Sequence, residues 1–257
     1  MRSIAAEAFG VGFLIRADDD LADQVVAILP PGHTSLPHPS GGLPAFTVGH
    51  GPAGSVRVHH EGELLTEAAD AEGALATLDA RLRTVIATGA PGMVFVHAGV
   101  AGHADRAIVL PAASMAGKTE LVAALLRAGA TYFSDEFAVL DPEGRVHPYP
   151  RPLSIRERGT RRATRTPAAA LEAPTGAGPA PVAVIAATRY APEGAWRPAR
   201  RSPADGALLL LAHAGQVRAH PERVLETVHR AARDAVVLEG PRGEAGDAAP
   251  ALLELLS

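Results

Sequence analysis

Lys118 is the only lysine among the 24 lysine and arginine residues of this chain, and it lies in the tripeptide Gly117-Lys118-Thr119. Arginine is a planar fork and lysine a compact charge on a flexible stem, so the two differ where a phosphate group is bound at close range. A chain that keeps lysine at one position only therefore points to a specific task for that side chain. Gly-Lys-Thr after an apolar run is typical of a phosphate-binding loop. The alternative is an accidental tripeptide at the start of a helix.

The segments on either side have the order that such a loop requires. Ala107–Leu110 is a short apolar run typical of a buried strand, Pro111–Ala116 is a turn of small residues, and from Thr119 to Gly129 the apolar spacing is helical. Backbone N–H groups at the start of such a helix surround a bound phosphate. Lys118 is expected to reach the β- and γ-phosphates, and the Thr119 hydroxyl to ligate Mg²⁺. The predicted nucleotide-binding residues of this segment are Ala113, Ser114, Met115, Ala116, Gly117, Lys118, Thr119 and Glu120.

The loop departs from the usual pattern of Gly, four residues and Gly-Lys-Ser/Thr. Ala112 stands where the first glycine belongs, and alanine resists the positive φ that glycine adopts there. Met115 is bulkier than the small residue often found at its position. A site with reduced affinity, or a degenerate one, is therefore an alternative to a working nucleotide site.

Two acidic residues and a histidine are candidates for the remaining chemistry. Asp135 and Glu136 follow a short apolar segment after the predicted helix. Mg²⁺ needs carboxylate ligands near the phosphates, and a kinase needs a base for the acceptor hydroxyl. The alternative is a solvated acidic turn. His97 ends an earlier strand-like run, where a histidine is usually a hydrogen-bonded core residue.

Composition and length limit the classes of protein. The chain has 257 residues, a formal net charge of −4, 47% hydrophobic residues and no cysteine. These values predict a globular protein without disulfides or thiolate metal sites, and they do not favour nucleic acid or a membrane surface as a partner. No signal-like segment or apolar stretch of bilayer-spanning length is found, so a cytoplasmic location is expected. A eukaryotic-type protein kinase is excluded, because its catalytic loop needs an asparagine and this chain has none.

The pattern divides the chain into an N-terminal α/β region, 1–90, and a second domain, 91–257. In the first, apolar spacing predicts strands over Val11–Ile15 and Val56–His59 and helices over Asp20–Leu29 and Ala71–Ala87. The stretch Pro30–Gly54 is dense in Pro, Gly, Ser and His, which favours a long surface loop.

In the second domain, strands are expected on both sides of the acidic pair. Met93–His97 is predicted as a strand that ends at His97, and Thr131–Phe133 and Phe137–Leu140 flank Asp135 and Glu136. The turn at 141–144 and the segment 145–147 complete a hairpin. Val182–Ala187 is predicted as a buried strand, followed by helices at about 204–213, 221–234 and 247–256.

These motifs together resemble the HPr serine kinase/phosphorylase superfamily, and more closely its HPr kinase-related proteins. The resemblance covers about residues 93–240 and is carried by Val96-His97-Ala98, Gly117-Lys118-Thr119-Glu120-Leu121 and Phe133-Ser134-Asp135-Glu136. It implies an α/β fold with an HPr kinase-like P-loop core, related to the ATP-dependent phosphoenolpyruvate carboxykinases, beside a smaller N-terminal α/β region. The family's usual glycines are missing at Ala112 and Met115, and Glu136 stands where aspartate is common.

The resemblance also implies roles for single residues. Lys118 and Thr119 would contact the phosphates and Mg²⁺, Asp135 would take the proton of the acceptor, and Glu136 would be linked to the metal. His97 would lie near the acceptor, and Arg189, after a buried strand, would contact phosphate. The implied ligands are ATP or another nucleotide and Mg²⁺, and the implied acceptor is a hydroxyl of a protein, peptide or small molecule. Related kinases form multimers, so a homo-oligomer is expected.

Two further function classes stay open. A nucleotide-binding pseudokinase or sensor is suggested by Ala112 and Met115. The second class is a P-loop hydrolase or transport ATPase. Two features count against it: the chain has no Ser-Gly-Gly-Gln-type signature and no run of four aliphatic residues before Asp135. The arginine-rich segment Arg151–Arg165 is either a solvated loop or a site for an acidic or phosphorylated substrate.

Overall fold

The computed structural model describes residues 1–37, 42–112, 117–192 apart from 157–162, and 194–256. The chain is mixed α/β and divides into two compact units, Met1–Pro91 and Gly92–Ser257. In the described part of the chain, no helix combines the length and the apolar character needed to cross a membrane.

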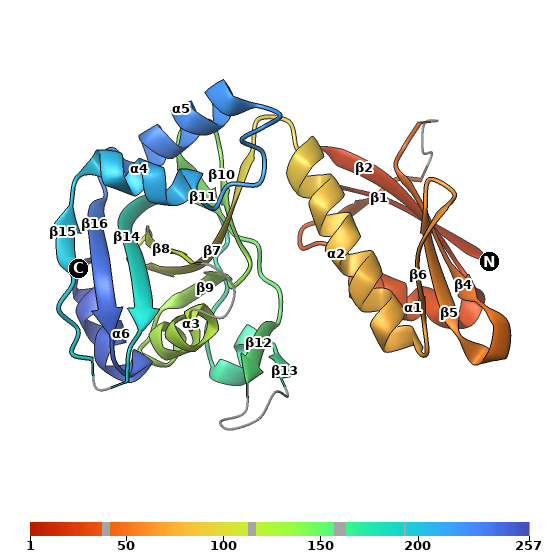
Figure 1. The fold of residues 1–257 in the computed structure, drawn as a ribbon, viewed down its shortest axis with the longest axis horizontal. Coiled ribbons are helices and arrows are strands. Elements are labelled where there is room, and N and C mark those ends of the chain that lie inside the picture. The colour runs from red at the N-terminus through yellow and green to blue at the C-terminus, as the bar shows by residue number, and fades with distance from the viewer. Residues whose placement is uncertain (38–41, 113–116, 157–162, 193, 257) are drawn as a thin grey trace. The chain divides into compact units, whose positions relative to one another are not determined.

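The smaller unit is a six-stranded sheet in the order β3-β1-β2-β4-β5-β6. Alternate residues of its strands are buried, such as Phe13 and Ile15 of β2 and Phe46 and Val48 of β4, and helices α1 and α2 pack on the sheet (Figure 1). Its elements are β1 (Arg2–Ala8), β2 (Val11–Ala17), α1 (Asp19–Ala27), β3 (Thr34–Ser35), β4 (Ala45–His50), the 3-10 turn η1 (Pro52–Gly54), β5 (Val56–His60), β6 (Glu63–Ala68) and α2 (Ala71–Gly89).

The predicted strands and helices of this unit are confirmed, but the long loop over 30–54 is wrong. Strand β4 lies inside that stretch and pairs with β2 on one side and β5 on the other. Apolar and polar residues alternate over 45–50, and Phe46 and Val48 are fully buried. The prediction of a loop followed the composition of this stretch, which is rich in Pro, Gly and His. The alternation of apolar and polar residues, which predicts a strand, is the stronger signal.

The larger unit is built on an eight-stranded sheet with the order β11-β10-β7-β8-β14-β16-β15, in which β9 also pairs with β7. Strands β8, β14 and β16 are parallel to one another, and β11 pairs with both β10 and β14. A separate two-stranded ribbon, β12-β13, completes the described strands. The strands are β7 (Val94–His103), β8 (Arg106–Pro111), β9 (Thr131–Ser134), β10 (Phe137–Leu140), β11 (Arg145–His147), β12 (Leu153–Arg156), β13 (Ala163–Thr166), β14 (Ala180–Tyr190), β15 (Ala199–Arg201) and β16 (Val236–Arg242).

Helices cover both faces of this sheet. Residues that alternate along β8 enter two different cores: Ile108 and Leu110 pack with α3 and α6, whereas Ala107 and Val109 pack with α4 and α5. The result is a helix–sheet–helix arrangement of three layers, and Figure 1 shows the two helix pairs on opposite sides of the sheet. The helices are α3 (Lys118–Arg127), η2 (Ala168–Leu171), α4 (Pro203–Leu211), α5 (Pro221–Ala232) and α6 (Ala245–Glu254).

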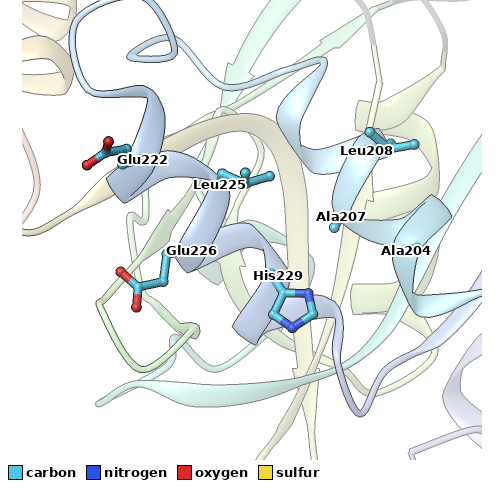
Figure 2. Close-up of a pocket in the computed structure, with 7 residues that line it drawn as sticks. All are labelled: Ala204, Ala207, Leu208, Glu222, Leu225, Glu226 and His229. Atoms are coloured by element: carbon cyan, nitrogen blue, oxygen red, sulfur yellow. The ribbon is translucent and has the colours of Figure 1, made fainter.

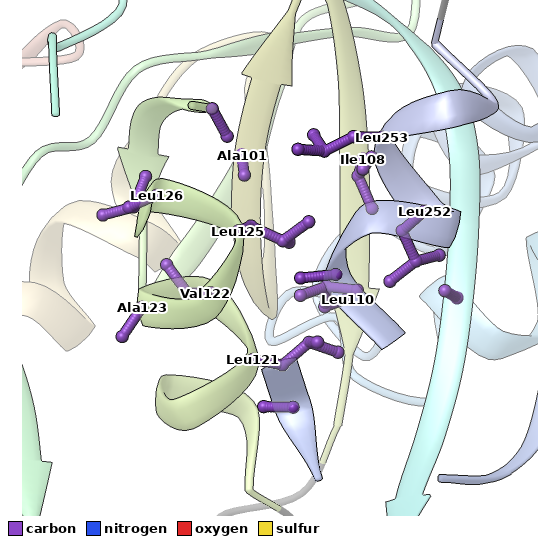
Figure 3. Close-up of a cluster of buried hydrophobic side chains, with 14 of the residues drawn as sticks. Ala101, Ile108, Leu110, Leu121, Val122, Ala123, Leu125, Leu126, Leu252 and Leu253 are labelled. Carbon is purple, nitrogen blue, oxygen red and sulfur yellow. The ribbon is translucent and has the colours of Figure 1, made fainter. Parts of the chain in front are cut away.

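The apolar face of α3 fixes this helix on the sheet. Leu121 and Leu125 are fully buried and pack into the cluster that contains Leu110 of β8 and Leu252 of α6 (Figure 3). Burying one leucine side chain contributes about 1.5–3 kcal/mol, so these contacts hold the start of α3 at a defined place beside β8.

The predicted strands and helices of the larger unit agree with the structure except at β7. This strand does not end at His97 but continues to His103, because Ala98–Gly102 is extended and pairs with β8. Two glycines and two alanines in that stretch resemble a turn in composition, but their small size suits a buried strand that lies close to a helix.

Candidate functional site

The Gly-Lys-Thr tripeptide forms the start of α3. Gly117 precedes the helix with φ of 78°, a left-handed conformation that glycine adopts without strain, and its carbonyl accepts a hydrogen bond from the Leu121 N–H at 3.2 Å. Lys118 and Thr119 are therefore the first two helical residues, where backbone N–H groups have no partner within the helix. Strand β8 ends at Pro111, before the tripeptide. The predicted ligands Ala113, Ser114, Met115 and Ala116 lie outside the described residues.

The Lys118 side chain lies against His97 of β7. Its Nζ is 3.1 Å from Nε2 of His97, and Nδ1 of His97 is 2.9 Å from the Ala112 carbonyl oxygen. A carbonyl only accepts, so Nδ1 carries the proton and Nε2 is left to accept from the lysine. His97 thus joins the end of β8 to the first residue of α3.

Gly99 of β7 provides the space for this lysine. A Cβ atom at Gly99 would lie 2.6 Å from Cγ2 of Val122 and 3.0 Å from Cγ of Lys118. Burial lowers the pKa of Lys118, while the negative charges of Asp135 and Glu136 oppose that shift. The lysine is therefore a half-buried amine that faces two carboxylates.

Asp135 contacts the second residue of α3. The Thr119 hydroxyl donates a hydrogen bond of 2.8 Å to Oδ2 of Asp135. Burial raises the pKa of Asp135 to about 6, although the hydrogen bond from Thr119 and the charge of Lys118 lower it. The other carboxylate oxygen, Oδ1, is buried and has no hydrogen-bond partner among the described residues. A buried carboxylate oxygen without a donor is costly unless a proton, a donor or a cation satisfies it.

The position of Asp135 follows from a break between two strands that share one partner. β9 and β10 both pair antiparallel with β7, β9 near Val100 and β10 up to His97. Between them the Ser134 Oγ accepts from the backbone N–H groups of Glu136 and Phe137 at 3.1 and 3.0 Å. This turn directs the side chain of Asp135 towards α3.

The structure adds Arg242, which the sequence did not single out. Arg242 ends β16, is only 2% exposed, and donates from Nη2 to the Gly117 carbonyl at 2.6 Å and from Nη1 to the Gly243 carbonyl at 2.9 Å. Its Nε is buried and has no hydrogen-bond partner among the described residues, and its guanidinium lies 5.7 Å from the ring centre of Tyr190. A buried guanidinium bonded to carbonyl oxygens brings a positive charge to the start of α3.

A sequence signal for Arg242 did exist. The apolar run Val236–Leu238 predicts a buried strand, and arginine and glycine follow it. Ligands bind beyond the carboxyl ends of strands in open α/β sheets, and the ends of β8, β14 and β16 meet at one edge because these strands are parallel.

Three other predicted residues lie at the margins of this group. Arg189 is exposed near the end of β14, opposite Pro241 in the strand register, and the next residue of β16, Arg242, is the one that bonds to Gly117. Glu120 is exposed in the first turn of α3, where a carboxylate favours the helix. Glu136 is half-buried, and its carbonyl accepts from the Ala98 N–H at 3.3 Å. The arginine-rich segment is described only in part, as the β12-β13 ribbon.

The predicted metal ligands are oxygen donors of the type that Mg²⁺ prefers. Thr119 and Asp135 are hydrogen-bonded neighbours, and the buried Oδ1 of Asp135 is available to a cation. The described residues contain no group of three or more His, Asp or Glu side chains that could hold a metal by itself. Mg²⁺ is usually held by one or two carboxylates together with substrate phosphates and waters.

Comparisons with protein-family models, with curated proteins and with solved structures give no match to this chain. The function must therefore be inferred from the residues and their geometry.

Proposed function

We propose that this chain is a Mg²⁺- and nucleotide-dependent phosphotransferase that acts on a hydroxyl group, with an HPr kinase-like P-loop core. One observation carries the proposal: the two residues of the Gly-Lys-Thr tripeptide that would face a nucleotide, Lys118 and Thr119, contact His97 and Asp135 respectively. The phosphate-binding residues and the candidate base thus form one group.

The start of α3 would bind the phosphates. The first backbone N–H groups of α3, which have no partner within the helix, and the helix dipole favour an anion. Lys118 and Arg242 add positive charge at the start of this helix. When bound, Mg²⁺ would neutralise charge that develops on the transferred group, with Thr119 and Asp135 as its protein ligands and Glu136 close by.

Asp135 would act as the base. Without a bound metal the pKa of Asp135 is about 6, so its carboxyl group is mostly ionised at pH 7 and can accept a proton. In the reaction the acceptor oxygen forms a bond to the γ-phosphorus, and the bond from that phosphorus to the bridging oxygen of the nucleotide breaks. The proton of the acceptor hydroxyl passes to Asp135, and the nucleoside diphosphate leaves.

The first test is thermal unfolding of the wild type and of Lys118→Ala with Mg-ATP, Mg-ADP or Mg-GTP. A ligand at about 100 times its Kd stabilises the folded state by about 2.7 kcal/mol. We expect a Mg²⁺-dependent rise in Tm that is lost in Lys118→Ala. Absence of a rise with every nucleotide would overturn the proposal.

Product analysis then separates the classes of function. Turnover of ATP only in the presence of a serine-bearing protein, a peptide or a small hydroxyl compound supports a kinase. Phosphate release without an acceptor would instead indicate a hydrolase. Nucleotide binding without turnover would indicate a sensor or pseudokinase. The missing activity would then be explained by Ala112, which stands where the usual loop pattern has glycine.

A further inference from the structure

Helix α5 has two different faces. One face is buried against the sheet through Val224, Thr227, Val228, Ala231 and Ala232. A second face carries Glu222, Leu225, Glu226 and His229, which follow the i, i+3, i+4, i+7 spacing of one helical stripe. Leu225 on this second face is 54% exposed. The second face therefore carries an exposed leucine beside two carboxylates, with a histidine at its end.

Helix α4 supplies the opposite wall of a groove. Ala204, Ala207 and Leu208 form a short stripe on α4, and Leu208 is 61% exposed. Between the two stripes lies an open groove of about 680 Å³. Figure 2 shows Leu225 directed towards α4, whereas the carboxylates of Glu222 and Glu226 point outwards from α5. The groove is thus lined by two alanines and a leucine of α4 and by a leucine of α5, and the carboxylates of Glu222 and Glu226 form its rim.

The dimensions match a short helix. The stripe from Glu222 to His229 spans two turns, about 10 Å at 1.5 Å per residue. An amphipathic helix that lies in an apolar groove places its apolar residues at i, i+3 or i+4 and i+7. The alanines of α4 leave room for such side chains, and the exposed leucines offer them apolar contact.

The charge on the rim selects the occupant. Glu222 and Glu226 lie one turn apart on the same edge. Glu226 forms an ion pair with Arg230, whereas Glu222 has no ion pair within the described part of the chain, so its negative charge is left for a basic side chain of the occupant. We propose that the groove between α4 and α5 binds a short basic amphipathic helix of a partner protein, with leucine-like side chains between Leu208 and Leu225 and arginine or lysine on the carboxylate rim. This inference does not rest on the proposed phosphotransfer.

The segment that joins α4 to α5 connects the groove to the strand of the candidate site. The His97 N–H donates to the His213 carbonyl at 2.9 Å, and the Gly215 N–H donates to the Phe95 carbonyl at 3.2 Å. Gln216, buried, accepts from the Phe95 N–H at 3.3 Å. A helix bound in the groove would contact α4 and α5. The segment that joins these two helices is hydrogen-bonded to the backbone of β7 at His97.

The test is selection of a displayed library of random 12-residue peptides against the full chain, followed by fluorescence anisotropy on the enriched peptides. We expect enriched sequences with two or more Leu, Met or Phe residues at helical spacing and a net positive charge. Their affinity should fall at least tenfold in Leu225→Arg and in Glu222→Arg, and should weaken with added salt.

Leu64→Arg is the matched control, because Leu64 of β6 is as exposed as Leu225, at 54%, and lies outside the groove. This variant should bind the peptides as the wild type does. The proposal is overturned if no peptide is enriched, if the enriched peptides are acidic, or if Leu225→Arg binds them with unchanged affinity. It is also overturned if the wild type forms a dimer that Leu225→Arg dissociates, since the groove would then bind a second copy.

Discussion

The hydroxyl of Thr119 donates a hydrogen bond of 2.8 Å to Oδ2 of Asp135, which joins the first turn of α3 to the turn between β9 and β10. Both elements also contact β7: β9 pairs with it, and Gly99 of β7 lies against Lys118 and Val122 of α3. The bond places a buried carboxylate within reach of whatever binds at the start of α3.

Replacing Asp135 with asparagine separates binding from transfer. The amide oxygen of asparagine still accepts from Thr119, so nucleotide binding should be retained, but asparagine cannot take a proton. We expect the transfer rate to fall by roughly 10²–10⁴-fold. Glu136→Gln is the control and should have a smaller effect. Full transfer activity in Asp135→Asn, measured in a kinetic assay with saturating nucleotide, would exclude Asp135 as the base.

The same carboxyl group predicts a pH dependence of stability. Its pKa is about 6 in the folded protein, against an ordinary value of 3.8, so the folded state binds more protons than the unfolded state between these values. The contribution of Asp135 to the free energy of unfolding is therefore lost as pH rises from about 4 to about 6. The free energy of unfolding of Asp135→Asn, relative to that of the wild type, should therefore rise by roughly 2 kcal/mol between pH 4.5 and pH 7, because one pH unit corresponds to about 1.4 kcal/mol.

Urea unfolding at the two pH values measures this difference. Asp105→Asn, in the exposed turn after β7, controls for the removal of one negative charge. If the gain in stability of Asp135→Asn were equal at both pH values, or larger at pH 4.5, the pKa of Asp135 would not be raised in the folded protein.

Gly99→Ala tests the close approach of α3 to β7. The added methyl group would meet Val122 and the stem of Lys118 at 2.6 and 3.0 Å, so the start of the helix must shift. Overpacking of this kind destabilises by about 1–3 kcal/mol, and the displaced Lys118 should weaken nucleotide binding as well. Gly246→Ala is the matched control, because a Cβ atom there meets nothing within 4 Å. Unchanged Tm and nucleotide affinity in Gly99→Ala would contradict the geometry.

Arg242→Lys tests the arginine at the end of β16. Lysine cannot bond the Gly117 and Gly243 carbonyls together as the planar guanidinium does. We expect a loss of stability of about 1–3 kcal/mol and at least a tenfold rise in the Kd for Mg-ATP, measured by calorimetry. Arg189→Lys, at an exposed position on the neighbouring strand, should change both values little. If Arg189→Lys raised the Kd and Arg242→Lys did not, the phosphate contact predicted for Arg189 would be favoured.

The local part of the candidate site could be predicted from sequence, because strand, turn and helix follow one another within a short stretch. The segment from Ala107 to Gly129 contains the apolar run, the glycine and the helical stripe that produce β8 and α3. The acidic turn was also visible, since Asp135 and Glu136 interrupt two extended segments.

The contact of Arg242 with Gly117 and the close approach of Lys118 to Gly99 could not be predicted from the sequence, because each depends on pairing between distant segments. The approach of Arg242 to Gly117 requires β14 to lie between β8 and β16, and no local pattern specifies strand order. Gly99 lies two residues beyond the predicted end of its strand, and its missing side chain gives Lys118 the space that it occupies.

The half-buried lysine has a practical consequence for chemistry on this protein. Lys118 is the only side-chain amine in the sequence, and burial lowers its pKa, so a larger share of it is in the unprotonated, nucleophilic form than for an exposed lysine. Besides the terminal amine, an acylating reagent therefore has one target. The extent of its modification, read by mass spectrometry with and without added ligands, reports directly on occupancy at the start of α3.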